Sequence, residues 1–188
     1  MAGQHATGQT RPDLKDALDQ PRQATENGYA DAQFERAVIR EALDWTRRAA
    51  EHGDADAQFE LGRAFAQGEA LELSFTEAAH WYRRAAEQYH ARAQLGLGSL
   101  YFLGLGVAQD YLAAHMWLNI SAARLPQGQA FERALALRNR VAKMLTPEHL
   151  VEAQRMAHGW LNKRKTSTAE GGDPVLLATL AEDEIPGE

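Results

Sequence analysis

Two Glu-x-x-His pairs are the residues of this sequence best suited to metal chemistry. Glu77 precedes His80 by three positions, and Glu87 precedes His90 by three. Pairs of this spacing hold di-iron centres in helical bundles, where they lie on two different helices and are joined by further glutamates. Here both pairs fall within one expected helix, and no two histidines stand four positions apart. We therefore expect no functional metal and no cofactor.

Hydrolytic chemistry would require an activated nucleophile. The chain contains no cysteine. The serines lack the strand–turn–helix context of a nucleophile elbow, and no glycine-rich loop follows a predicted strand to hold a phosphate. We therefore predict that the protein is not an enzyme. The available serines are Ser74, Ser99, Ser121 and Ser167.

The charge distribution argues against nucleic acid and membranes as partners. The net charge is −6, and the segment 166–188 contributes six acidic residues and no basic one, so residues 1–165 are neutral overall. Binding to phosphate backbones or anionic lipid requires a net basic face. No apolar run approaches the ~20 residues of a membrane span. The polar start of the chain resembles no secretory signal. We therefore expect a cytoplasmic protein.

An internal repeat organises the part of the chain that would position these side chains. Ala57-Gln58 returns as Ala93-Gln94, and the same separation of 36 residues recurs through the segment 57–122. A fixed period in this range is typical of a solenoid, in which each unit buries its apolar face against its neighbours. The further pairs are Leu61/Leu97, Gly62/Gly98, Phe65/Tyr101, Gly68/Gly104, Ala78/Ala114, Trp81/Trp117 and Ala86/Ala122, and Trp45 stands 36 before Trp81.

Hydrophobic periodicity and end signals predict a series of helices. Ser74 and Asp110 are predicted N-caps, and Ser74 with Glu77 has the pattern of a capping box. Gly104 and Gly106 are predicted to turn the chain with positive φ. The residues at 62, 78, 98 and 114 are small, which predicts that helices cross closely there. The expected helices are 30–51, 55–67, 75–88, 91–103, 111–123 and 128–144, with another after TPEHL.

The pattern Ala-x-x-x-Leu-Gly-x-x-Tyr-x-x-Gly-x-Gly-Val-x-x-Asp-x-x-x-Ala-x-x-Trp at 93–117 is similar to the Sel-one-like repeats, relatives of the tetratricopeptide repeat. The C-terminal part resembles the helical pair that closes bacterial members, with Thr146 as N-cap and Pro147 at N1. The resemblance implies an all-α, right-handed α/α solenoid of antiparallel helix hairpins, with about two and a half 36-residue repeats and a closing helical pair.

The expected organisation has three parts. Residues 1–28 form an N-terminal extension that we expect to be largely disordered. Residues 29–165 form the helical repeat domain, and 166–188 form an acidic flexible tail with a possible short helix at 174–181. Within the domain the expected units are a truncated capping unit at 29–52, repeats at 53–88 and 89–124, and closing helices at 128–165.

Surface binding is the remaining class of function. The tryptophans at 45, 81 and 117 recur at the repeat period, so we expect them in the core rather than on a stacking platform. In tetratricopeptide relatives the first helix of each hairpin lines a concave peptide-binding face. The resemblance therefore implies a partner-binding face formed by Phe59, Arg63, Gln67, Leu95, Ser99 and Phe102. We expect Phe59 and Phe102 to be exposed anchors, although both could pack under flanking helices.

These observations favour a non-catalytic scaffold, adaptor or regulator that binds a protein or peptide of unknown identity. A self-associating structural protein is an alternative. A hydrolase is a less favoured alternative, which the resemblance implies because some members of the family are described as hydrolases. The apolar stripe of the acidic tail suggests that the tail competes for the same groove.

Overall fold

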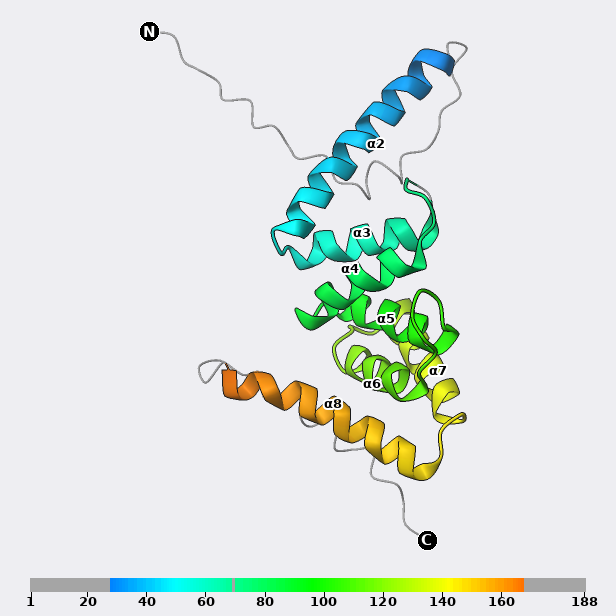
Figure 1. Ribbon diagram of the computed structural model, residues 1–188, viewed down its shortest axis with the longest axis vertical. Helices are drawn as coiled ribbons and strands as arrows, with labels where there is room; N and C mark the ends of the chain where they lie inside the picture. Colours follow the sequence, from blue (N-terminus) through cyan, green and yellow to red (C-terminus); the bar gives the residue numbers. More distant parts are fainter. Residues whose placement is uncertain (1–27, 69, 168–188) are drawn as a thin grey trace.

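The computed structural model describes residues 28–68 and 70–167, with only the backbone described for 28–35 and 163–167. The described part consists of seven α-helices (Figure 1). The predicted extension before Gly28 and the predicted tail helix at 174–181 lie outside it. The helices are α2 (Gly28–Glu51), α3 (Ala55–Gln67), α4 (Phe75–Glu87), α5 (Ala91–Leu103), α6 (Tyr111–Ala122), α7 (Gln129–Ala142) and α8 (Pro147–Ser167).

The helices stack along the long axis of the molecule, from α2 at one end to α8 at the other (Figure 1). The helices α3 and α4 form one antiparallel hairpin, and α5 and α6 form the next. Each hairpin contacts the following one through its second helix, as stacked units must if they are to share a core. The predicted all-α solenoid is confirmed.

Side-chain caps recur at the start of the second helix of each unit. Ser74 Oγ accepts a hydrogen bond from Glu77 N, Asp110 Oδ1 from Ala113 N, and Thr146 Oγ1 from His149 N. The caps stand 36 residues apart, so α8 begins in the register of the repeat.

Only one of the two hydrogen bonds of the capping box predicted at Ser74 is formed. The Oγ of Ser74 caps α4, but its N–H donates to Phe65 O (3.0 Å) rather than to the Glu77 side chain. Asp110 N donates to Tyr101 O in the same way, at 3.1 Å. In both units the backbone of the connection is therefore tied to the end of the first helix.

The small residues let the two helices of each hairpin approach closely. A Cβ added to Gly62 would lie 2.7 Å from the Tyr82 ring, and one added to Gly98 would lie 2.9 Å from Leu118 Cγ. Tyr82 and Leu118 are themselves 36 residues apart. The predicted crossings are therefore present, and the side chains that pack over the glycines come from α4 and α6.

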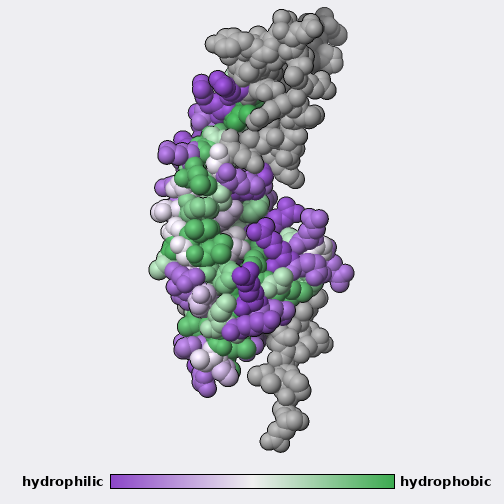
Figure 2. Space-filling model, turned by 90° about the vertical axis from the view of Figure 1, so that its right-hand side faces the viewer, coloured by the Kyte–Doolittle hydropathy of each residue, from purple (hydrophilic) through white to green (hydrophobic). Residues whose placement is uncertain are grey.

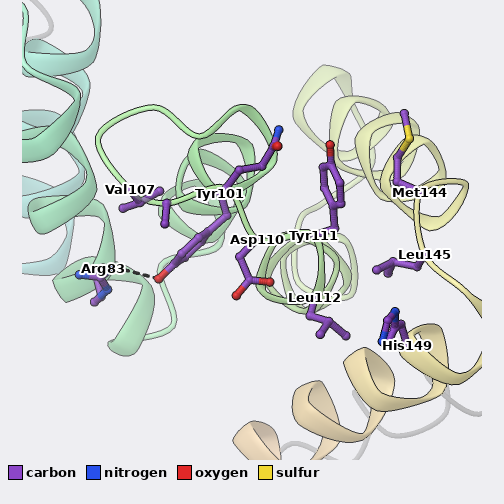
Figure 3. Close-up of a pocket in the computed structure, with 11 residues that line it drawn as sticks. Arg83, Tyr101, Val107, Asp110, Tyr111, Leu112, Met144, Leu145 and His149 are labelled. Atoms are coloured by element: carbon purple, nitrogen blue, oxygen red, sulfur yellow. Dashed lines mark hydrogen bonds between the residues drawn. The ribbon is translucent and has the colours of Figure 1, made fainter.

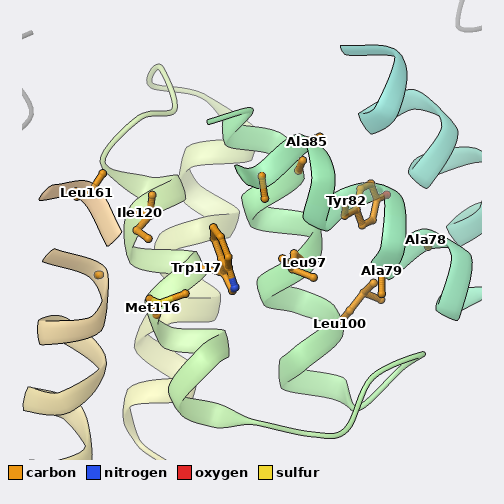
Figure 4. Close-up of a cluster of buried hydrophobic side chains, with 13 residues drawn as sticks. Ala78, Ala79, Tyr82, Ala85, Leu97, Leu100, Met116, Trp117, Ile120 and Leu161 are labelled. Atoms are coloured by element: carbon orange, nitrogen blue, oxygen red, sulfur yellow. The ribbon is translucent and has the colours of Figure 1, made fainter. Parts of the chain in front are cut away.

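The tryptophans of the repeat do not share one environment. Trp81 and Trp117 are buried, at 8% and 7% exposure, and Figure 4 shows Trp117 near the centre of its cluster. Trp45 is 43% exposed, which corrects the expectation that it lies in the core. The helix α2 packs chiefly against α3, and its buried Ala42, Leu43 and Ala50 share a cluster with Trp81, to which Trp45 does not belong.

The last two helices both pack on α6 rather than chiefly on each other. Ala157 and Leu161 of α8 join the cluster of Trp117, and the rings of Trp117 and Trp160 lie 5.3 Å apart. The two closing helices that the resemblance implied are therefore present, and both pack on α6. Among the described helices, none combines the length and apolar character needed to cross a membrane.

Candidate functional site

An open groove of about 760 Å³ lies between the α5–α6 connection and the turn from α7 to α8 (Figure 3). We call it the connection groove. Side chains from α4, α5, α6 and the start of α8 converge on it, so stacking of successive units forms it. Its lining consists of Arg83, Tyr101, Val107, Ala108, Gln109, Asp110, Tyr111, Leu112, Met144, Leu145 and His149.

One side of the groove carries a positioned cation. Arg83 Nη2 donates to Tyr101 Oη at 2.9 Å, and the guanidinium carbon lies 6.0 Å from the centroid of that ring. The bond leaves other guanidinium N–H groups to donate elsewhere. The nearby Asp110 carboxylate caps α6 through Oδ1. The polar groups of the groove can therefore orient a bound group, and Arg83 supplies a donor for a carboxylate.

The other side of the groove is apolar and accessible. Met144 is 54% exposed, and Leu112 and Leu145 are half-buried. Two more exposed leucines, Leu73 (54%) and Leu103 (56%), lie at or beside the corresponding connections of the preceding units. Figure 2, which faces this side of the molecule, shows apolar side chains gathered in a band along it. Exposed apolar surface of this kind typically marks an interaction site.

The predicted residues of α3 remain accessible in part. Phe59 is half-buried, and its ring stacks on His90 with centroids 4.5 Å apart. Arg63 Nε donates to Glu60 Oε2 at 2.8 Å, and its Nη1 lies 3.4 Å from Gln67 Oε1. These residues therefore offer one aromatic face and a polar surface beside it, and their role in binding remains a prediction.

The predicted residues of α5 are mostly covered. Leu95 and Phe102 are each 8% exposed and pack in a cluster with α6 and α7. The Arg140 guanidinium of α7 lies 5.4 Å from the Phe102 ring centroid. Ser99 Oγ donates to Leu95 O at 2.8 Å. The expectation that Leu95 and Phe102 are exposed was wrong, because α7 lies against this face of α5.

The two histidines of the Glu-x-x-His pairs make a helix cap and a ring contact. His90 is the N-cap of α5, and His80 is exposed with its ring edge against Trp81 at 5.1 Å. Within the described residues no three of His, Asp and Glu come together in a way that could hold a metal ion.

Sequence reasoning did not find the connection groove. Arg83 and Met144 are 61 residues apart in the chain, and neither stands out within its own helix or turn. The cap at Thr146 was a usable signal, because it puts Met144 in the connection before α8.

The stacked hairpins define a helical-repeat protein. The Sel1 repeat model matches residues 27–54, 55–90 and 91–124, which together make up more than half of the chain. The chain belongs to the Sel1 repeat family, as the pattern at 93–117 predicted. Proteins built from this repeat are generally protein-interaction modules.

Two solved structures are similar to this chain. One is c5321, described as a protective antigen present in uropathogenic Escherichia coli strains displaying an SLR fold, with 27% identity and a TM-score of 0.64. The match covers 94% of this chain and 34% of c5321, so this chain spans about a third of that protein. The other is a Sel1 repeat protein from Oxalobacter formigenes, with 34% identity, a TM-score of 0.48, and coverage of 65% and 95%. A search of curated proteins gave no match.

Proposed function

We propose that this chain is a non-catalytic protein-interaction module that binds a peptide segment of its partner in the connection groove. The observation that carries the proposal is Met144, a large apolar side chain that is 54% exposed beside a groove of about 760 Å³. An apolar side chain of the partner that covers Met144 and Leu112 would remove both from water, which is the main source of affinity in such contacts.

The polar side of the groove indicates the chemistry of the segment. Arg83 is held by Tyr101 at 2.9 Å, so it needs little further ordering to bind a carboxylate. An acidic side chain or a C-terminal carboxylate near Arg83 would complement it. The proposed ligand is thus a short segment with one or two apolar side chains next to an acid.

The predicted helix-A face is the rival surface. Phe59, Arg63 and Gln67 remain at least partly accessible there, whereas Leu95 and Phe102 are covered by α7. Because Leu95 and Phe102 are covered, only the part of this face that α3 contributes remains accessible. We therefore favour the connection groove, and we use substitution of Phe59 to test the helix-A face.

The proposal includes a cytoplasmic location and neither nucleic acid nor lipid as partner. Its support is the neutral overall charge of residues 1–165, since phosphate backbones and anionic lipid attract proteins with a net positive charge. Self-association is the alternative of a different class, and light scattering over a range of protein concentrations distinguishes it.

The test is selection of binding peptides from a random displayed library, followed by titration of a selected peptide. Met144→Glu places a charge in the groove and should weaken binding about tenfold or more, as loss of an interface anchor does. Met156→Glu is the matched control, because Met156 is also an exposed methionine (40%), lies within α8 and is not among the residues lining the groove. Binding that is lost in Phe59→Ala and kept in Met144→Glu would assign the site to the helix-A face instead.

A further inference from the structure

The first helices of the two complete repeats are capped by different residues at equivalent positions. Asp54 Oδ1 accepts from Ala57 N at 2.8 Å and caps α3. His90, which stands 36 residues later, accepts from Ala93 N through Nδ1 at 3.0 Å and caps α5. An imidazole nitrogen accepts a hydrogen bond only when it carries no proton. The cap on α5 therefore depends on neutral His90.

The same ring joins the two repeats. His90 Nε2 lies 3.2 Å from Asp56 Oδ1 at the start of α3, and the ring stacks on Phe59 of α3. The side chain of His90 is 15% exposed, whereas that of Asp56 is 92% exposed. With Nδ1 accepting, Nε2 carries the proton and donates to Asp56. One neutral imidazole thus caps one helix and contacts the helix of the preceding unit.

The charges around His90 act in opposite directions. Asp56 and Glu60 of α3 favour the imidazolium, and Arg92 of α5 opposes it. Burial outweighs them and lowers the pKa of His90 below its ordinary value. The charged groups that act on the ring thus come from the two helices that it joins.

We propose that His90 makes the junction between α3 and α5 sensitive to acid. Proton uptake at Nδ1 turns the acceptor of the cap into a donor that faces the Ala93 N–H. It also places a positive charge at a helix N-terminus, where the macrodipole disfavours cations. The ring must then leave the cap, which loosens the first turn of α5 and its contact with Phe59. This device goes beyond the proposed function and holds whichever surface binds the partner.

The sign of the pH effect follows from the lowered pKa. Because the folded state favours neutral His90, the stabilisation is fully present above the unfolded pKa of about 6.5. It is lost as pH falls below that value towards the folded pKa. The equivalent cap at Asp54 needs no neutral imidazole, so the sensitivity belongs to the second repeat.

The test compares wild type with His90→Asn, whose amide oxygen can cap a helix at any of these pH values. The matched control is His52→Asn, because the His52 ring is exposed and its Nδ1 contacts the carbonyl oxygen of Arg48 in the last turn of α2. Urea unfolding between about pH 8 and about pH 5 gives the stability of each variant. Amide exchange of Ala93, together with the NMR titration of the His90 ring, reports the cap in wild type without any substitution.

We expect wild type and His52→Asn to lose stability together below pH of about 6.5, while His90→Asn loses less. The Ala93 exchange rate in wild type, divided by the intrinsic rate of an unstructured amide at the same pH, should rise about fivefold as His90 titrates, the change that corresponds to one lost cap. Equal pH profiles for wild type and His90→Asn would overturn the proposal. An Ala93 amide whose exchange does not follow the His90 titration would overturn it as well.

Discussion

Gly106, in the connection between α5 and α6, lies directly against the backbone of Phe75 at the start of α4. A Cβ on Gly106 would overlap the carbonyl group of Phe75. Gly106 also has φ +67, a conformation that L side chains rarely adopt. The connection between α5 and α6 can therefore pack directly on the start of α4 only because residue 106 has no side chain.

Gly106→Ala should destabilise the protein by about 2–4 kcal/mol, because strain at positive φ adds to overlap with backbone that cannot move aside. Urea unfolding measures the change. Gly159→Ala is the control, since Gly159 lies within α8 and a Cβ there would meet nothing within 4 Å. It should be neutral or stabilising by up to about 1 kcal/mol. Equal effects at the two sites would contradict this close packing of the connection on α4.

Two buried glutamines should differ in their contribution to stability. Gln58 Nε2 donates to Ala50 O at 2.9 Å, and its Oε1 accepts from Gln88 Nε2 at 2.8 Å. Gln94 Nε2 donates to Ala86 O at 3.2 Å, but its buried Oε1 has no hydrogen-bond partner among the described residues.

Gln58→Leu should destabilise by about 1–3 kcal/mol, since it removes two hydrogen bonds. Gln94→Leu should cost less, because the substitution also removes an acceptor whose desolvation is not repaid. Denaturation midpoints of the two variants, compared at equal m-values, decide the order. A larger loss at Gln94 would show that its Oε1 is satisfied.

The exposure of the tryptophans predicts unequal effects of truncation. Trp117→Ala should cost about 3–5 kcal/mol, as removal of a buried aromatic ring does. Trp45→Ala should cost less than about 1 kcal/mol, because Trp45 is 43% exposed. Thermal and urea unfolding of both variants provide the comparison. Similar losses would mean that Trp45 is covered in solution.

Tyr82 should make the fold sensitive to alkaline pH. Its ring lies between Gly62 of α3 and Gly96 of α5, and a Cβ on either glycine would come within 2.8 Å of it. Burial raises the pKa of Tyr82 to about 12 from the ordinary 10.0. The folded state thus favours the neutral phenol, so its contribution is complete below pH 10 and is lost as pH rises towards 12.

Tyr82→Phe should therefore lose less stability than wild type between pH 10 and 12. Tyr89→Phe serves as the control, because Tyr89 is a partly buried tyrosine in the connection between α4 and α5. Urea unfolding at several pH values in this range gives the comparison. Parallel profiles for wild type and Tyr82→Phe would contradict the assignment of the effect to Tyr82.

Much of the fold could be predicted because its signals are local. Ser74, Asp110 and Thr146 each bond to a backbone N–H three residues away, so a short stretch of sequence is enough to recognise them. The period of 36 residues likewise fixes which helix faces recur. The candidate site could not be predicted in this way, because Arg83 and Met144 line the same groove only after three helical units have stacked.

The sequence by itself determined the helices, their caps, and the positions that are equivalent from one repeat to the next. Only the tertiary structure decided which equivalent positions are covered. Trp81 is buried, whereas Trp45 is exposed. Phe102 is covered by α7, whereas Phe59 is only half-buried. The physical reason is that a repeat pattern sets the direction of a side chain, whereas burial depends on the neighbouring unit that packs there.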